Sequence, residues 1–144
     1  MMDYFARAFG TWFMGFFPLT EIYFAVPAGL ATGLDDLSVI FWAVLGNVLP
    51  IFLIHYGFDN FIRPSRFGQW LERNVSDQAK ARLSRYGVFF VLIITPWIGV
   101  WLMAVTAKMM GMSYRRFAPA ALVSITAYAV FITWMVRTGA NALG

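Results

Sequence analysis

Two charged side chains stand alone inside long hydrophobic stretches of this sequence. Glu21 is the only charged residue between positions 8 and 34, and Lys108 is the only one between positions 87 and 112. A carboxylate at bilayer depth costs roughly 2.5 to 3.5 kcal/mol, and the loss of hydration favours its neutral form. Glu21 can therefore couple proton flow to transport, or attract a cationic substrate once it is ionised. The alternative interpretation is a structural carboxylate at a turn.

Two basic side chains are candidates for the same chemistry. Lys108 could pair with Glu21 if their two segments meet, or it could extend along its stem to the membrane interface. His55 could relay protons, because histidine exchanges them near neutral pH, or it could be an interfacial residue beside Tyr56 and Asp59. A single histidine and no cysteine argue against a metal or haem site. No nucleophile with a neighbouring base stands out, so we expect neither a cofactor nor an enzyme.

Both hydrophobic stretches contain residues that break helices. Proline removes a backbone donor and glycine frees the dihedral angles, so neither stretch is typical of one continuous spanning helix. Irregular backbone at membrane depth needs a cover of protein or a water-filled cavity. We therefore predict two re-entrant hairpins. The residues expected to form their turns and a substrate path are Pro18, Thr20, Pro27, Gly29, Asn47, Pro96 and Gly99.

The first hairpin is expected to turn at Pro18–Glu21, with the Thr20 side chain capping the second arm. Asp35 and Asp36 then return the chain to water, and they can cap the helix that follows. Asn47 lies in the middle of that helix. It is equally explained by a hydrogen bond between helices and by contact with a substrate.

Composition places the chain in a membrane. Of its 144 residues 60% are hydrophobic and 12% are charged, and the mean hydropathy is +0.68. The apolar runs Leu37–Phe58 and Phe117–Val136 are each long enough to cross about 30 Å of hydrocarbon. Residues 1–11 have the make-up of an interfacial segment, and 8–17 would form the first arm of the hairpin.

The central linker, residues 61–86, carries six of the basic residues. Its apolar residues Phe67, Trp70, Leu71 and Val75 recur in helical phase, which favours a helix on the membrane surface. Most basic residues of the chain flank apolar segments, as expected of charges that set topology, so nucleic-acid binding is not indicated. The charge distribution places this linker in the cytoplasm whether the broken stretches are re-entrant or fully spanning.

The hydropathy pattern and the placement of the helix breakers predict an internal repeat. A shift of 78 residues aligns Pro18 with Pro96 and Gly33 with Gly111, and it superposes both broken runs and both spanning runs. If each half has one re-entrant hairpin and one crossing, the second half is inverted relative to the first. Inverted repeats with interrupted segments are the best sequence indication of a transporter binding site. If the broken runs spanned fully, the protein would instead be a plain four-helix bundle.

The first motif runs from Pro18 and Glu21 through Pro27 and Gly29 to Gly33. Its other elements are Gly46-Asn47 before Pro50, Tyr86-Gly87, and the turn from Pro96 to Gly99. Over about residues 14 to 137 this pattern resembles the small multi-drug export protein family, which is itself distantly similar to DedA-type membrane proteins. Two positions depart from the pattern: Tyr23 stands where the family usually has arginine, and the second turn lacks its second proline.

The resemblance implies efflux, whereas the DedA-like similarity implies movement of a lipid-carrier phosphate or another phospholipid. We therefore predict a small secondary transporter that exports or translocates small amphipathic molecules and is proton-coupled. The alternative is a flippase or scramblase for a polyprenyl phosphate or phospholipid. The implied location is the inner (plasma) membrane of a bacterium or archaeon.

The predicted fold class is an all-α integral membrane protein with two inverted repeats, each a re-entrant helical hairpin followed by a transmembrane helix. Interfacial helices complete a single membrane domain, residues 1–144, with repeats over about 4–60 and 87–137. Two hairpins and two crossings are too few to enclose a pathway, so we expect a homodimer. The other partners are the lipid bilayer and the amphipathic or lipid-phosphate substrate.

Overall fold

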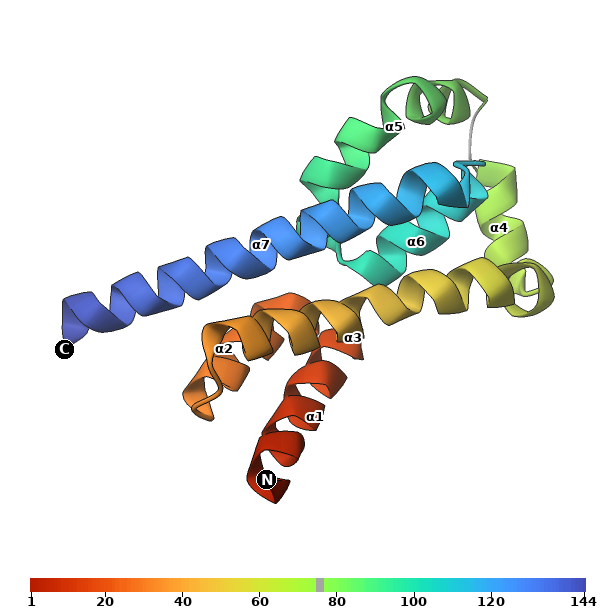
Figure 1. Ribbon diagram of the computed structural model, residues 1–144. Helices are drawn as coiled ribbons and strands as arrows, with labels where there is room; N and C mark the ends of the chain where they lie inside the picture. The colour runs from red at the N-terminus through yellow and green to blue at the C-terminus, as the bar shows by residue number, and fades with distance from the viewer. Residues whose placement is uncertain (75–76) are drawn as a thin grey trace. The chain divides into compact units, whose positions relative to one another are not determined.

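The computed structural model describes residues 1–74 and 77–144, and the side chains at 67, 71, 72, 74, 77–80 and 82–84 also lie outside what it describes. The described residues form helices and no strand, so the predicted all-α fold class is confirmed (Figure 1). The elements are α1 (Met2–Phe16), α2 (Glu21–Ala31), α3 (Asp36–Gly57), the π-helical turn η1 (Phe58–Ile62), α4 (Arg66–Asn74), α5 (Asp77–Ile98), α6 (Val100–Met109) and α7 (Tyr114–Leu143).

The chain divides into two compact units. The first comprises Met1–Leu49 and Ile125–Gly144, and the second comprises Pro50–Ser124. The long helix α3 begins in the first unit and ends in the second, whereas α7 begins in the second and ends in the first. The first unit also contains α1 and α2, and the second also contains η1, α4, α5 and α6.

In the first unit, α1 and α2 form a helical hairpin. Phe17 ends α1 with φ −70° and ψ 130°, the extended backbone that a following proline imposes, here Pro18. The last turn of α2 is closed at Gly33, whose φ is +87°, a value that glycine adopts without steric cost. The amide of Leu34 then bonds to the Gly29 carbonyl at 3.4 Å, as in a Schellman termination.

Two glycines let α1 and α3 pack closely in this unit. A Cβ atom at Gly46 would lie 2.1 Å from the carbonyl oxygen of Trp12, and one at Gly15 would lie 2.5 Å from that of Ala43. Small residues of this kind permit such approach of two backbones. The buried core beside this crossing is formed by Ala25, Val26, Leu30, Leu34, Val39, Ala43 and Ala129.

An ion pair joins α3 to the final part of α7 within the first unit. The guanidinium of Arg137 donates from Nε at 2.8 Å and from Nη2 at 2.6 Å to Oδ1 of Asp36. Asp36 is the first residue of α3 and Arg137 lies towards the end of α7, so the two helices run in opposite directions here. Both side chains are about half exposed, so the pair contributes on the order of 1 kcal/mol or less in water.

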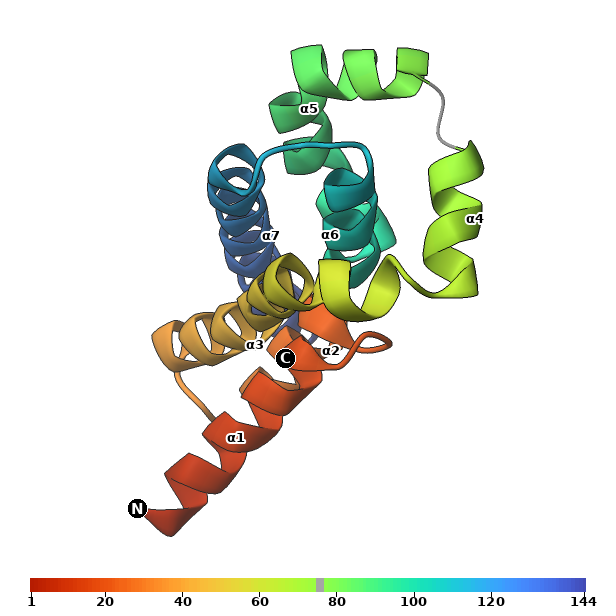
Figure 2. The same cartoon turned by 90° about the vertical axis from the view of Figure 1, so that its right-hand side faces the viewer.

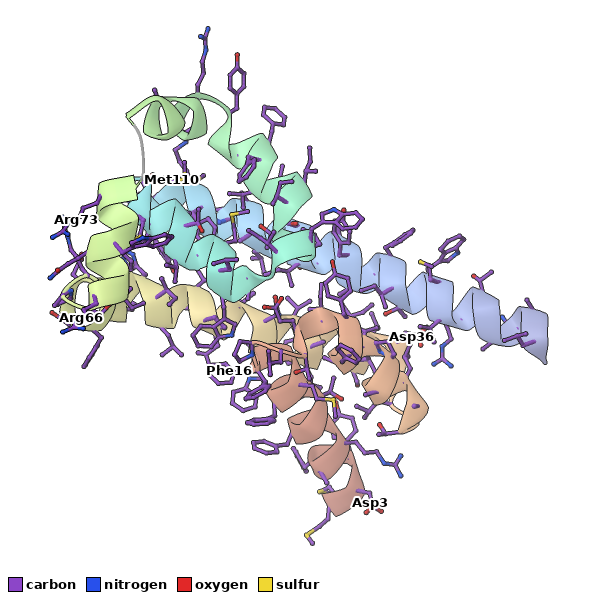
Figure 3. All side chains as sticks on the ribbon, turned by 180° about the vertical axis from the view of Figure 1, so that it is seen from behind. Asp3, Phe16, Asp36, Arg66, Arg73 and Met110 are labelled. Carbon is purple, nitrogen blue, oxygen red and sulfur yellow. The ribbon has the colours of Figure 1, made fainter. Side chains whose placement is uncertain are left out.

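In the second unit, α5 and α6 meet at Gly99. Its φ of 88° and ψ of 153° belong to a region that is essentially restricted to glycine, and this breaks the helix between Ile98 and Val100. Figure 2 shows α5 bending part-way along its length. The Ser124 hydroxyl of α7 donates to the carbonyl of Leu92 in α5 at 2.7 Å. Arg66 and Arg73 are labelled in α4 in Figure 3.

Within the part of the chain that the structure describes, two helices are long and apolar enough to cross a membrane, as the sequence predicted. They span Asp36–Ile62 and Tyr114–Leu143, and their apolar 18-residue windows have mean hydropathies of 2.3 and 1.7. The second helix extends well beyond the predicted Phe117–Val136. The segment predicted to be interfacial, 1–11, overlaps the predicted hairpin arm, 8–17, and their locations at the interface and in a hairpin stay predictions. Since no residue between Met2 and Phe16 interrupts the hydrogen-bond ladder, both belong to the single helix α1, whose ends lie near Asp3 and Phe16 in Figure 3.

The predicted surface helix in the linker is only partly covered by the described residues. The backbone forms α4 over Arg66–Asn74, and Trp70 is exposed. The Phe67 and Leu71 side chains and the whole of Val75 lie outside the described residues. The apolar phase on which the prediction depended is therefore represented by Trp70 alone.

The shift of 78 residues also relates local structure. It carries the start of α3 at Asp36 onto the start of α7 at Tyr114, and α2 onto residues 99–109, where α6 lies. Gly33 and Gly111 both have positive φ, 87° and 78°. The bond from the Leu34 amide to the Gly29 carbonyl recurs from Met112 to Ala107, and the bond from Gly33 to Leu30 recurs from Gly111 to Lys108.

Candidate functional site

The turn between α1 and α2 contains the first group of predicted site residues. Its backbone is held by bonds from the amides of Thr20 and Glu21 to the Phe17 carbonyl, at 3.2 and 3.1 Å. The Thr20 hydroxyl donates back to the carbonyl of Met14 at 2.5 Å. The prediction that this side chain caps α2 is wrong. Thr20 has helical dihedrals, φ −104° and ψ −49°, whereas a capping residue needs extended ones to reach the following amides.

Glu21 is the first residue of α2 and is buried, with 8% of its surface exposed. Two influences act on its carboxyl group in opposite directions. Low hydration favours the neutral acid, whereas the amides at a helix N-terminus favour the anion.

The backbone at Glu21 is unusual for this residue type. Its φ is +45°, and among the described residues it is the one non-glycine with positive φ. The left-handed conformation costs a residue with a Cβ roughly 1 to 2 kcal/mol. The shift of 78 residues places Gly99, with φ of 88°, at the corresponding position, and both amides bond to the carbonyl four residues earlier. The turn therefore accepts glycine more readily than glutamate, and backbone geometry does not explain the carboxylate.

Asn47 has a structural partner. It is buried, and its side-chain amide donates to the carbonyl of Gly15 at 2.9 Å. The last four carbonyls of a helix have no partner within it, and Gly15 carries one of those of α1. Of the two explanations left open by the sequence, the hydrogen bond between helices is thus observed in the first unit.

The remaining breaker residues act through the backbone. Pro27 lies inside α2 and Pro96 lies in the last turn of α5, directly before the break at Gly99. Gly29 faces α1, where an added Cβ would lie 2.8 Å from Oγ1 of Thr11. Their part in a substrate path stays a prediction.

The structure brings His55 and Lys108 to one pocket in the second unit. The pocket has a volume of about 240 Å³. Its lining residues are Ile51, Ile54, His55, Ala104, Ala107, Lys108, Gly111, Met112, Ser113, Tyr114 and Phe117. They come from α3 near its end, from α6, from the connection between α6 and α7, and from the start of α7.

His55 and Lys108 each have a neighbour there. The His55 ring stacks on Tyr114, with centroids 4.1 Å apart and planes inclined by 28°. The Lys108 ammonium lies 3.7 Å from Asp59 in η1. The predicted pair of Lys108 with Glu21 would join residues of the two units, and it stays a prediction.

Sequence reasoning missed Tyr114 and Ser113 as pocket residues. The sequence did contain a signal for these two residues. Glycine is common just after the end of a helix, so Gly111 predicts that the next helix starts close to Ser113 and Tyr114. The correspondence of Glu21 with Gly99 was also missed, although the same 78-residue shift aligns them.

Residues 21–132 match the family described as "Putative small multi-drug export protein". The chain belongs to the small multi-drug export family. The matched range starts at Glu21 and includes α2 through most of α7, so the resemblance seen from the motifs is confirmed. No curated protein and no solved structure matches the chain. Family membership and the two long apolar helices make it a membrane protein of an export family, which is not a family of enzymes.

Proposed function

We propose that this protein is a proton-coupled secondary transporter that exports small amphipathic molecules, with Glu21 as the group that carries the proton. The observation on which the proposal depends is the buried carboxylate of Glu21 at a position where the backbone favours glycine. A residue retained against its conformational cost is expected at a functional site. Membership of the small multi-drug export family supports transport as the activity.

The hairpins α1–α2 and α5–α6 are proposed to be re-entrant. Crossing a bilayer takes about 20 helical residues. α1 has 15 residues, α2 has 11 and α6 has 10, while the apolar part of α5 covers Arg85–Ile98. These lengths support hairpins that enter the membrane and leave on the same side.

The two repeats are proposed to be inverted. α3 and α7 occupy corresponding places in the repeats, and within the first unit they run in opposite directions, as the pair of Asp36 with Arg137 requires. That relation is the one expected of an inverted repeat. A homodimer and a cytoplasmic linker complete the proposal, and cysteine crosslinking in membranes tests the dimer.

The transport test uses proteoliposomes with an imposed pH gradient and a fluorescent amphipathic cation. Glu21→Gln removes the ionisable proton with little change in size, and we expect coupled transport to fall to the level of empty liposomes. Glu21→Asp retains the proton and should keep partial activity. Normal transport by Glu21→Gln would remove this residue from the mechanism.

Topology is testable because the sequence has no cysteine. Asp3, Leu19 and Ala31 are exposed in the structure, so each is a suitable position for a single cysteine. For a re-entrant hairpin, an impermeant maleimide labels positions 3 and 31 from one side of the membrane and does not label position 19 from the other. Labelling of positions 3 and 31 from opposite sides would contradict the hairpin.

One observation favours a second candidate, the translocation of a lipid phosphate. α6 begins at Val100 with no acidic residue in its first turn, and a helix N-terminus of this kind favours an anion. Proteoliposomes containing a fluorescent phospholipid distinguish the two candidates. Lipid movement without transport of the amphipathic cation would favour the flippase.

A further inference from the structure

The pocket of the second unit combines a cationic side chain, Lys108, with polar and apolar residues. The polar residues that line it include Lys108, His55 and Ser113, close to the first residues of α7. The lining residues include no carboxylate. The first backbone amides of a helix have no partner within the helix and favour a nearby negative charge. Ser113 directly precedes α7, so this end of the helix lies at the pocket. These groups together favour a negatively charged ligand.

Asp59 is the acidic neighbour that such a ligand must compete with. Its carboxylate lies 3.7 Å from Lys108 and 3.5 Å from Arg63, distances longer than those of good charged hydrogen bonds. The Asp59 side chain is 56% exposed and that of Lys108 is 28% exposed. An exposed ion pair of this kind contributes little free energy in water. An anion that binds Lys108 therefore loses little free energy by displacing Asp59.

The rest of the pocket lining is mostly apolar. It includes the side chains of Ile51, Ile54, Ala104, Ala107, Met112 and Phe117. The volume of about 240 Å³ lies below the range of about 300 to 1,000 Å³ that is typical for drug-sized ligands. The pocket therefore fits one end of a molecule, a head group with the first part of its chain.

We propose that this pocket binds an anionic amphiphile, with the anionic head at Lys108 and His55 and the apolar chain against the Ile51, Ile54 and Phe117 side chains. The site lies entirely within the second unit, and it does not depend on the role proposed for Glu21. The π-helical turn η1 supports it, because such turns are rare and frequent at functional sites, and this one carries Asp59 beside Lys108.

The single histidine of the chain reports on this pocket. The full-length protein, labelled with ¹³C-histidine, is placed in nanodiscs of zwitterionic lipid, and the His55 ring signal is followed by NMR. The probes are decyl sulfate and decyltrimethylammonium, which have the same chain and opposite charge. We expect a saturable shift with decyl sulfate at concentrations where the cation produces none. A saturable shift with the cation alone would overturn the proposal.

Two variants should move the affinity for decyl sulfate in opposite directions. Lys108→Gln removes a charged hydrogen bond and is expected to weaken binding roughly tenfold or more. Asp59→Asn removes the competing carboxylate and is expected to tighten binding. Arg85→Gln is the matched control of charge, since Arg85 lies over the Tyr86 ring and does not line the pocket, and it should leave the affinity unchanged. Equal weakening by Lys108→Gln and Arg85→Gln would contradict a local site.

Further probes identify the source of the anion. In one arm, phosphatidylglycerol is added to the nanodisc lipid. If it shifts the His55 signal and free decyl sulfate then causes no further shift, the site binds a lipid head group. A shift produced by decyl sulfate in either type of nanodisc assigns it to a free amphiphile. If inorganic sulfate binds as tightly as decyl sulfate, the apolar wall plays no part and the proposal fails.

Discussion

The turn at Glu21 and the break at Gly99 occupy the same position in two repeats, and they differ in what the position carries. Both have positive φ, both amides bond to the carbonyl four residues earlier, and a short helix follows each. One has the residue that this backbone favours, and the other has a buried carboxylate. The comparison indicates that the backbone break is common to both repeats, whereas the proton chemistry that we propose belongs to one. Exchanging residues between corresponding positions tests this directly.

The largest effect on stability is expected where the repeats differ in packing. Gly46 corresponds to Ser124, and a Cβ at Gly46 would lie 2.1 Å from the backbone of Trp12. Gly46→Ser should therefore destabilise the protein by about 3 kcal/mol, at the upper end of the cost of overpacking, because backbone cannot move aside as a side chain can. Titration with SDS in mixed micelles, followed by tryptophan fluorescence, measures the change.

Gly10→Ser is the matched control, because nothing lies within 4 Å of a Cβ at Gly10. It should change stability by less than about 1 kcal/mol. Equal stability of the Gly46→Ser and Gly10→Ser variants would show that α1 and α3 do not cross as closely as described.

The next effect concerns the backbone at the second break. Gly99→Ala keeps the side chain small and tests the dihedral angles alone, since φ of 88° with ψ of 153° excludes residues with a Cβ. We expect a loss of about 2 kcal/mol in the same SDS titration. Gly139→Ala, in open space within α7, should instead be neutral or slightly stabilising. If both substitutions have the same sign, the break at Gly99 does not depend on positive φ.

The corresponding exchange in the first repeat should have the opposite sign. Glu21→Gly relieves a left-handed glutamate and removes a buried carboxylate, so we expect a gain of about 1 kcal/mol in stability. The same variant should lose proton-coupled transport. A stable but inactive protein separates function from folding, whereas a protein that loses both would identify Glu21 as a structural residue.

Much of this architecture follows from local sequence signals. Pro18 and Gly99 break the helices where the sequence predicts, and the 78-residue shift places the starts of α3 and α7 at corresponding positions. Such features depend on one or two residues and their dihedral limits, which the sequence shows directly.

The candidate sites were less predictable because they depend on choices between partners. The Thr20 hydroxyl bonds backwards to Met14, as its helical dihedrals require, and no motif distinguishes that from a cap. The stacking of His55 on Tyr114 joins residues that are far apart in the sequence. It depends on how α3 and α7 pack in the second unit. A lone histidine in an apolar run could be identified, but the neighbour that it meets could not.

The smallest expected effect is on the acid dependence of stability, and it concerns the residues that precede α3 and α7. Asp35 corresponds to Ser113. The hydroxyl and amide of Ser38 both donate to the Asp35 carboxylate, at 2.6 and 3.0 Å, and these bonds hold the pKa of Asp35 below its usual value. A lowered pKa in the folded state means that the stabilisation is complete above the unfolded-state pKa, and that it is lost as pH falls through the folded-state value. The start of α3 should therefore weaken in acid.

Asp35→Asn keeps a capping side chain that does not titrate, so it should reduce the acid sensitivity of the SDS midpoint while changing the neutral-pH midpoint little. The fully exposed position of Asp35 makes this the weakest of the four predicted effects. An unchanged acid dependence in Asp35→Asn would show that another carboxylate is responsible.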